Sequence, residues 1–166
     1  MRLNSFQPTE IKIQISPTRR IGDLINIWHT AGEGVDLVLD PRYGLKFRPE
    51  SVKVIYAFDI IGQTESAKVE EMLKSFAQAL QPGGELYIIE TDFDYVTRAA
   101  VGGDISPEDF SRDFSRKTYV TLQYLAKMLA KIGFPQDKQV VWYDTNGLKF
   151  TKHHYESVVL GRKGNG

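Results

Sequence analysis

Leu80-Gln81-Pro82-Gly83-Gly84-Glu85-Leu86-Tyr87-Ile88-Ile89-Glu90 is the stretch of the sequence that decides the fold. It contains the end of a helix, a Pro-Gly-Gly turn and a strand. Proline cannot continue a helix, and glycine adopts left-handed backbone angles without a Cβ clash. The apolar run Leu86 to Ile89 is typical of a strand that is buried on both faces. The stretch therefore predicts the junction of a parallel αβ unit.

Apolar runs on both sides of this junction predict further elements. The expected strands are Ile11 to Ile15, Leu24 to Trp28, Val35 to Leu39, Val52 to Phe58, Leu86 to Thr91, Gln139 to Tyr143 and Tyr155 to Leu160. Apolar residues spaced by three or four predict helices over 66–80 and 119–132, with Ser66 as the N-cap of the first. The segment 92–107 contains Gly102-Gly103 and is expected to be an irregular loop.

This order of elements predicts an α/β fold with a three-layer, doubly wound, mostly parallel sheet of six or seven strands. A single domain is expected to span residues 1–166. The strands at 35–39, 52–58 and 86–91 should be the most buried, and the last strand should run antiparallel to its neighbour. Ligands of such sheets bind at the carboxyl ends of the strands, so the residues that follow strands are the candidate site residues.

Composition excludes several kinds of protein. The chain carries 21 basic and 21 acidic side chains, so no net charge attracts nucleic acid or anionic lipid. Because cysteine is absent, there is no disulfide, thiolate nucleophile or Cys-based zinc site. His153-His154 lacks a third ligand at metal spacing, and no metal site is expected. No apolar run approaches the about 18 residues of a membrane span, and a cytoplasmic protein without a membrane partner is expected.

Seven segments follow one another in a characteristic order and spacing: Gly34 to Asp40, Phe47 to Ala57, the predicted helix up to Leu80, Pro82-Gly83-Gly84, Tyr87 to Asp92, Leu125 to Phe134, and Ser157 to Lys163. Together they resemble a compact subgroup of the class I methyltransferases that use S-adenosylmethionine (SAM). No single segment is specific, so the resemblance depends on their order. It implies SAM as the cofactor and methyl transfer to an acceptor, a small molecule or a macromolecule, that the sequence does not identify.

The resemblance also implies site residues at the ends of the strands. Ser16 and Thr18 would lie in the cofactor loop after the first strand, and Asp40 would bind the adenine amine. Phe58 would lie against the adenine, and Asp59 would orient or deprotonate the acceptor. Alternatives remain open: Asp40 caps the turn before a proline, Phe58 packs in the core, and Asp59 caps backbone N–H groups. An acid inside an apolar run must be paired or must face the cleft.

Some motifs of the family are replaced in this chain. The loop Ser16 to Asp23 has a proline and two arginines where a glycine-rich loop is expected, and Asn26 to His29 lacks the acid that binds the ribose hydroxyls. Each lost charge-assisted hydrogen bond removes about 1.5–3 kcal/mol, so we expect SAM binding to be micromolar or weaker. Two functions remain open: a SAM-dependent methyltransferase, and a non-catalytic methyltransferase-like protein that has lost cofactor binding and acts as a binding or interaction module.

Overall fold

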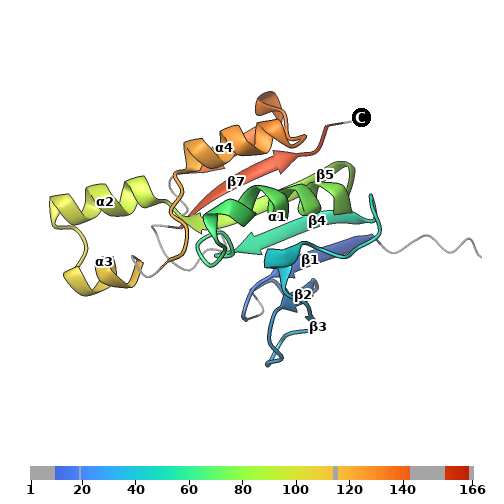
Figure 1. Ribbon diagram of the computed structural model, residues 1–166, viewed down its shortest axis with the longest axis horizontal. Helices are drawn as coiled ribbons and strands as arrows, with labels where there is room; N and C mark the ends of the chain where they lie inside the picture. The colour runs from blue at the N-terminus through green and yellow to red at the C-terminus, as the bar shows by residue number, and fades with distance from the viewer. Residues whose placement is uncertain (1–9, 19, 114–115, 143–155, 165–166) are drawn as a thin grey trace, which may run out of the picture.

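The computed structural model describes residues 10–18, 20–113, 116–142 and 156–164 (Figure 1). The strands are β1 (Ile11–Ile15), β2 (Ile25–Trp28), β3 (Leu37–Val38), β4 (Val52–Phe58), β5 (Leu80–Thr91), β6 (Gln139–Trp142) and β7 (Glu156–Arg162). The helices are α1 (Ser66–Ala79), α2 (Phe93–Gly102), α3 (Pro107–Asp113) and α4 (Leu122–Lys131), with short 3-10 turns η1 (Pro41–Tyr43) and η2 (Gln136–Lys138). None of the described helices is long and apolar enough to cross a bilayer.

The strands form one sheet in the order β3-β2-β1-β4-β5-β7-β6. The first five strands of this order pair in parallel, whereas β7 runs antiparallel to both β5 and β6. The strand order reverses between β1 and β4, which is where ligands of open α/β sheets bind. The predicted α/β class, the seven-stranded mostly parallel sheet and the antiparallel last strand are confirmed.

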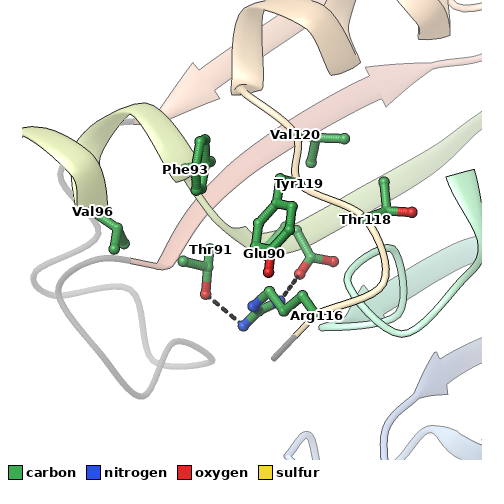
Figure 2. A pocket seen from close by; sticks show the side chains of 8 residues that line it. All are labelled: Glu90, Thr91, Phe93, Val96, Arg116, Thr118, Tyr119 and Val120. Atoms are coloured by element: carbon green, nitrogen blue, oxygen red, sulfur yellow. Dashed lines mark hydrogen bonds and ion pairs between the residues drawn. The ribbon is translucent and has the colours of Figure 1, made fainter. Parts of the chain in front are cut away.

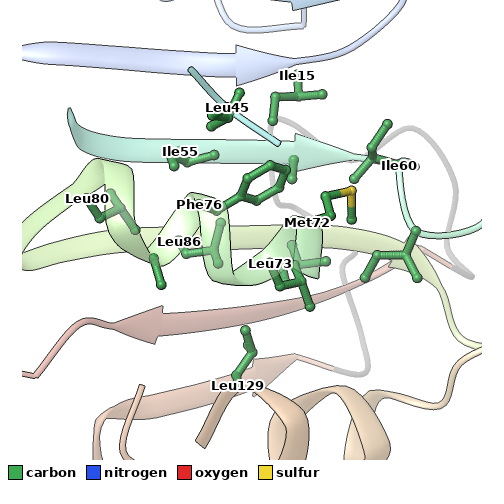
Figure 3. Close-up of a cluster of buried hydrophobic side chains, with 14 of the residues drawn as sticks. Ile15, Leu45, Ile55, Ile60, Met72, Leu73, Phe76, Leu80, Leu86 and Leu129 are labelled. Atoms are coloured by element: carbon green, nitrogen blue, oxygen red, sulfur yellow. The ribbon is translucent and has the colours of Figure 1, made fainter. Parts of the chain in front are cut away.

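One face of the sheet is covered by α1 and α4, and the main core lies there (Figure 3). Its fully buried side chains come from both helices and from the central strands: Ile15, Ile55, Leu73, Phe76, Leu86, Leu125 and Leu129. The apolar stripe predicted for 66–80 is the stripe that α1 buries. Burial of a side chain as large as Phe76 contributes about 1.5–3 kcal/mol to folding, so α1 is held to the sheet mainly by this contact face.

The opposite face is covered differently. Its buried cluster consists of Phe58, Ile89 and Val158, with Ile21, Tyr56 and Tyr87 packed against it. None of these residues belongs to a described helix. The loop after β1 folds back instead, because Gln14 Oε1 accepts hydrogen bonds of 3.0 Å from the backbone N–H groups of Arg20 and Ile21. This loop therefore occupies part of the face that a helix covers in a doubly wound fold.

The expected burial of Val35 to Leu39 is wrong. Only Leu37–Val38 is a strand, and the two side chains are 40% and 57% exposed. The reason is the position of β3, which is the last strand of the sheet and pairs with β2 alone. An apolar run indicates a strand, but it does not tell whether that strand lies in the middle of the sheet or at its edge.

Two local expectations are also corrected. Glu65, not Ser66, is the N-cap of α1, and its side chain makes no capping hydrogen bond. The segment 92–107 is not irregular, because it contains α2. Asp92 caps that helix by accepting from the Asp94 N–H, and Gly103 ends it in the left-handed conformation at φ 81°. The glycine pair is thus a helix terminus. The predicted helix over 119–132 is α4, which begins after the N-cap Thr121.

Candidate functional site

The carboxyl ends of β1, β4 and β5 lie along one edge of the sheet, and α2 and α3 extend beyond it (Figure 1). Asp59 follows β4 directly, and Glu90 and Thr91 are the last residues of β5. These side chains therefore meet at the edge where the fold places ligands.

Asp59 is held by its backbone as well as by its side chain. Its φ is 55°, a left-handed value that few residues other than glycine adopt. Its N–H donates to the Ile89 carbonyl at 2.9 Å, and its own carbonyl accepts from Gln63 Nε2 at 2.9 Å. The carboxylate is 39% exposed and accepts from Arg116 Nη1 at 2.5 Å. Asp59 thus lies at the strand end, and its described partner is a guanidinium.

Glu90 is the buried acid of the site, with a side chain that is 1% exposed. Its Oε1 accepts from Arg116 Nη1 at 2.5 Å, and its Oε2 accepts from the Ile61 N–H at 2.9 Å. Burial, and then the neighbouring charge of Asp59, raises the pKa of Glu90 well above its usual value. The sequence analysis missed this residue, although an acid that ends the apolar run of β5 is the same signal that marked Asp59.

Arg116 joins the two acids. It also donates from Nη2 to Thr91 Oγ1 at 2.8 Å, and its side chain is only 17% exposed. The approach is so close that a Cβ on Gly62 would lie 2.3 Å from Arg116 Nη1. No local motif marks Arg116, because its partners lie 57 and 26 residues away along the chain.

The segment 116–120, which we call the strap, crosses the carboxyl ends of β4 and β5 (Figure 2). The Lys117 N–H donates to the Gly62 carbonyl at 2.8 Å, and Thr118 Oγ1 donates to the Thr64 carbonyl at 2.5 Å. The Val120 carbonyl accepts from the Phe93 N–H at 3.2 Å. These bonds and the ion pairs of Arg116 fasten the strap over the strand ends.

A small pocket remains beneath the strap. It is lined by Glu90, Thr91, Phe93, Val96, Arg116, Thr118, Tyr119 and Val120 (Figure 2). Its interior of about 10 Å³ has room for about one water molecule. The rings of Phe93 and Tyr119 both line it, with their centroids 4.9 Å apart. The pocket is therefore far too small to enclose a cofactor.

The residues predicted to contact the cofactor differ in their exposure and in their contacts. Ser16 is fully buried, and its Oγ has no hydrogen-bond partner in the described part of the chain. Thr18 is exposed. Phe58 is fully buried in the cluster on the opposite face, with the Arg20 guanidinium 4.7 Å from its ring centre. Phe58 is therefore packed among buried side chains, as in the core-packing alternative given above.

Asp40 caps the turn η1. It accepts from the Arg42 backbone N–H at 3.1 Å and from the Arg42 guanidinium at 2.8 and 2.6 Å. The Arg42 side chain lowers the pKa of Asp40. Asp40 therefore makes the contacts of a turn-capping residue, which is the alternative given above for this acid.

The residues present do not fit SAM as a set. The expected adenine acid is engaged by Arg42, and the expected adenine ring contact, Phe58, is buried. Trp28 ends β2 where a ribose acid is expected, and it is 5% exposed within the core. Among the described residues, no group of three His, Cys, Asp or Glu side chains is placed to hold a metal ion, and His153-His154 lies outside them.

Comparison with known proteins identifies the fold. Neither protein-family models nor curated proteins match this sequence. Solved structures do. A SAM-dependent methyltransferase of Thermotoga maritima, described as a possible histamine N-methyltransferase, superimposes with a TM-score of 0.62 at 15% identity, over 95% of this chain and 84% of that one.

Two larger enzymes superimpose as well. Phosphoethanolamine N-methyltransferase 2 of Haemonchus contortus, solved with S-adenosylhomocysteine, has a TM-score of 0.57 at 13% identity over 96% of this chain. The CurJ carbon methyltransferase has a TM-score of 0.58 at 15% identity over 96% of this chain. The present chain spans 51% and 50% of their lengths. The sheet order, the antiparallel β7 and these superpositions show that this chain has the fold of the class I SAM-dependent methyltransferases.

Proposed function

We propose that this protein is a methyltransferase-fold binding module that has lost the use of SAM. The observation that carries the proposal is the strap, which places the Arg116 guanidinium between Asp59 and Glu90 at the carboxyl ends of β4 and β5. In a methyltransferase of this fold, this edge of the sheet must admit the cofactor or the acceptor. Here its polar groups are bonded to one another.

Charge supports the same proposal. The sulfonium of SAM is a cation, and the two carboxylates that could attract it at this edge are already paired with the Arg116 guanidinium. Opening the site would leave the buried Glu90 without Arg116, and a buried polar group that loses its hydrogen-bond partner costs about 1–3 kcal/mol. A ligand that enters here must first offset that cost. Binding to surfaces outside the strand ends requires no such rearrangement.

Calorimetric titration with SAM and with S-adenosylhomocysteine tests the proposal. We expect dissociation constants weaker than about 1 mM, which corresponds to about −4 kcal/mol. The variant Arg116→Ala serves as the comparison, because it removes the guanidinium while leaving the backbone bonds of the strap. Micromolar binding by the unaltered protein would contradict the proposal. If SAM or S-adenosylhomocysteine binds only to the variant, Arg116 is the group that prevents binding to the unaltered protein.

One observation favours methyl transfer as the second candidate. Ser16 directly follows β1. Its hydroxyl is buried and has no hydrogen-bond partner among the described residues. A buried polar group without a hydrogen bond costs about 1–3 kcal/mol, and a ligand could supply the bond. If SAM binds in the micromolar range and Ser16→Ala weakens that binding at least tenfold, a SAM-dependent methyltransferase of unknown acceptor becomes the better description.

A further inference from the structure

We propose that the carboxyl ends of β4 and β5 form a guanidinium-binding site, which Arg116 occupies from within the chain as an autoinhibitory contact. The ligand that the site takes in its place is the arginine side chain of a partner protein. Asp59, Glu90 and Thr91 each supply an acceptor to the guanidinium. The inference rests on the proposed function in one respect only, namely that this edge of the sheet binds something other than SAM.

The acceptors are arranged for a planar fork of donors. Arg116 Nη1 lies 2.5 Å from Asp59 Oδ1 and 2.5 Å from Glu90 Oε1. Its Nη2 lies 2.8 Å from Thr91 Oγ1, so both terminal nitrogens of the guanidinium donate within the site. A guanidinium presents its donors in fixed directions, whereas the ammonium of lysine is a compact point charge. The site is therefore expected to select arginine over lysine.

Two of the acceptors are held in place by bonds that do not involve Arg116. The side chain of Glu90 is 1% exposed, and its Oε2 accepts from the Ile61 N–H at 2.9 Å. The backbone of Asp59 is fixed by the bond from its N–H to the Ile89 carbonyl at 2.9 Å. These bonds remain when the Arg116 side chain leaves, and the buried Glu90 then requires another donor.

The Arg116 side chain can leave the site without release of the strap. It is 17% exposed and its partner Asp59 is 39% exposed, so the ion pair lies at the surface. The strap stays fastened by the Lys117 N–H and the Thr118 hydroxyl. A ligand without a guanidinium would leave Glu90 unpaired, but a second guanidinium restores the same hydrogen bonds and offsets the cost of opening. Arginine is therefore the ligand whose entry costs least.

Titration of the variant Arg116→Ala tests the site. The probe is Nα-acetyl-arginine amide, which reproduces an arginine within a chain, and the readout is the amide chemical shifts of Ile61 and Gly62, which lie against Glu90. We expect saturable binding in the low millimolar range and binding of Nα-acetyl-lysine amide that is weaker by about tenfold or more. Adding Asp59→Asn should weaken binding of the probe by about fivefold or more, because one charged acceptor is lost. The absence of a saturable shift up to about 20 mM probe would overturn the site.

Titration of the unaltered protein tests the autoinhibitory contact. The same probe should bind about tenfold or more weakly than to Arg116→Ala, because Arg116 competes for the acceptors. Equal affinities would place the probe elsewhere, and no saturable shift up to about 200 mM at constant ionic strength would show that Arg116 is not exchanged; either result overturns the contact. Free L-arginine is titrated alongside, and tighter binding of it than of the blocked probe would overturn the assignment to a partner protein.

Arg98→Ala is the matched control, because it removes a guanidinium from an exposed ion pair with Asp94 on α2. It should leave the affinity for the probe within about twofold of that of the unaltered protein. A gain equal to that of Arg116→Ala would show general charge attraction and overturn the site. Circular dichroism checks folding, and Arg116→Lys replaces Arg116→Ala if the alanine variant is unfolded. Micromolar binding of S-adenosylhomocysteine by the unaltered protein would contradict the proposed function, whereas the absence of probe binding would contradict only the guanidinium site.

Discussion

Asp59 adopts a left-handed backbone conformation at the end of β4, with φ at 55°. Substitution by alanine and by glycine removes the ion pair with Arg116 in both cases, but only alanine retains the Cβ that makes this conformation unfavourable. We therefore expect Asp59→Gly to be more stable to urea than Asp59→Ala by about 1 kcal/mol. The ion pair itself is partly exposed and should contribute about 0.2–1 kcal/mol. An alanine variant as stable as the glycine variant would show that the strand end relaxes freely.

Glu90 makes stability depend on pH. Burial raises its pKa in the folded protein above the value near 4.3 of an unfolded chain, so the folded state retains the proton to higher pH. The free energy of unfolding should consequently decrease as pH rises from about 4 through the folded pKa, by at most about 1.4 kcal/mol per unit. Glu90→Gln cannot titrate, and its stability relative to the unaltered protein should increase over this range. Parallel stability curves from pH 5 to 8 would contradict this expectation.

At the scale of elements, the strap depends on a glycine in the loop after β4. Gly62→Ala would place a Cβ 2.3 Å from Arg116 Nη1, and the guanidinium cannot move without loosening its bonds to Asp59 and Glu90. We expect a loss of about 1–3 kcal/mol, as for other overpacked sites. Gly32→Ala is the control, because nothing lies within 4 Å of its added Cβ. Urea denaturation of the two variants measures the difference, and equal stabilities would show that Arg116 is easily displaced.

At the scale of the whole molecule, stability should be concentrated where α1 crosses the central strands. Phe76 is fully buried in that core, whereas Val38 is 57% exposed on the edge strand β3. Phe76→Ala should therefore cost about 3–5 kcal/mol, and Val38→Ala should stay within about 0.5 kcal/mol. Both values come from urea denaturation. A large loss for Val38→Ala would mean that another part of the protein covers the edge.

Apolar periodicity and turn chemistry determined most of the sheet. The alternation in β1, the continuous runs of β4 and β5 and the stripe of α1 each indicate locally which side of an element is buried, so these elements could be predicted from the residues themselves. Asp59 could be singled out for the same reason, because a carboxylate within an apolar run must find a partner or water.

Only the tertiary structure decided which residues meet. Local patterns do not encode that Arg116 reaches Glu90 and Asp59, since an ion pair between distant segments depends on where the fold brings their loops. The exposure of β3 likewise follows from its place at the edge of the sheet, and the burial of Phe58 follows from the loop that folds back over the opposite face. The sequence by itself determined the elements and the class of fold. The assembled sheet decided that the strand ends carry a fastened strap, because only packing brings segments 26 and 57 residues apart within hydrogen-bond distance.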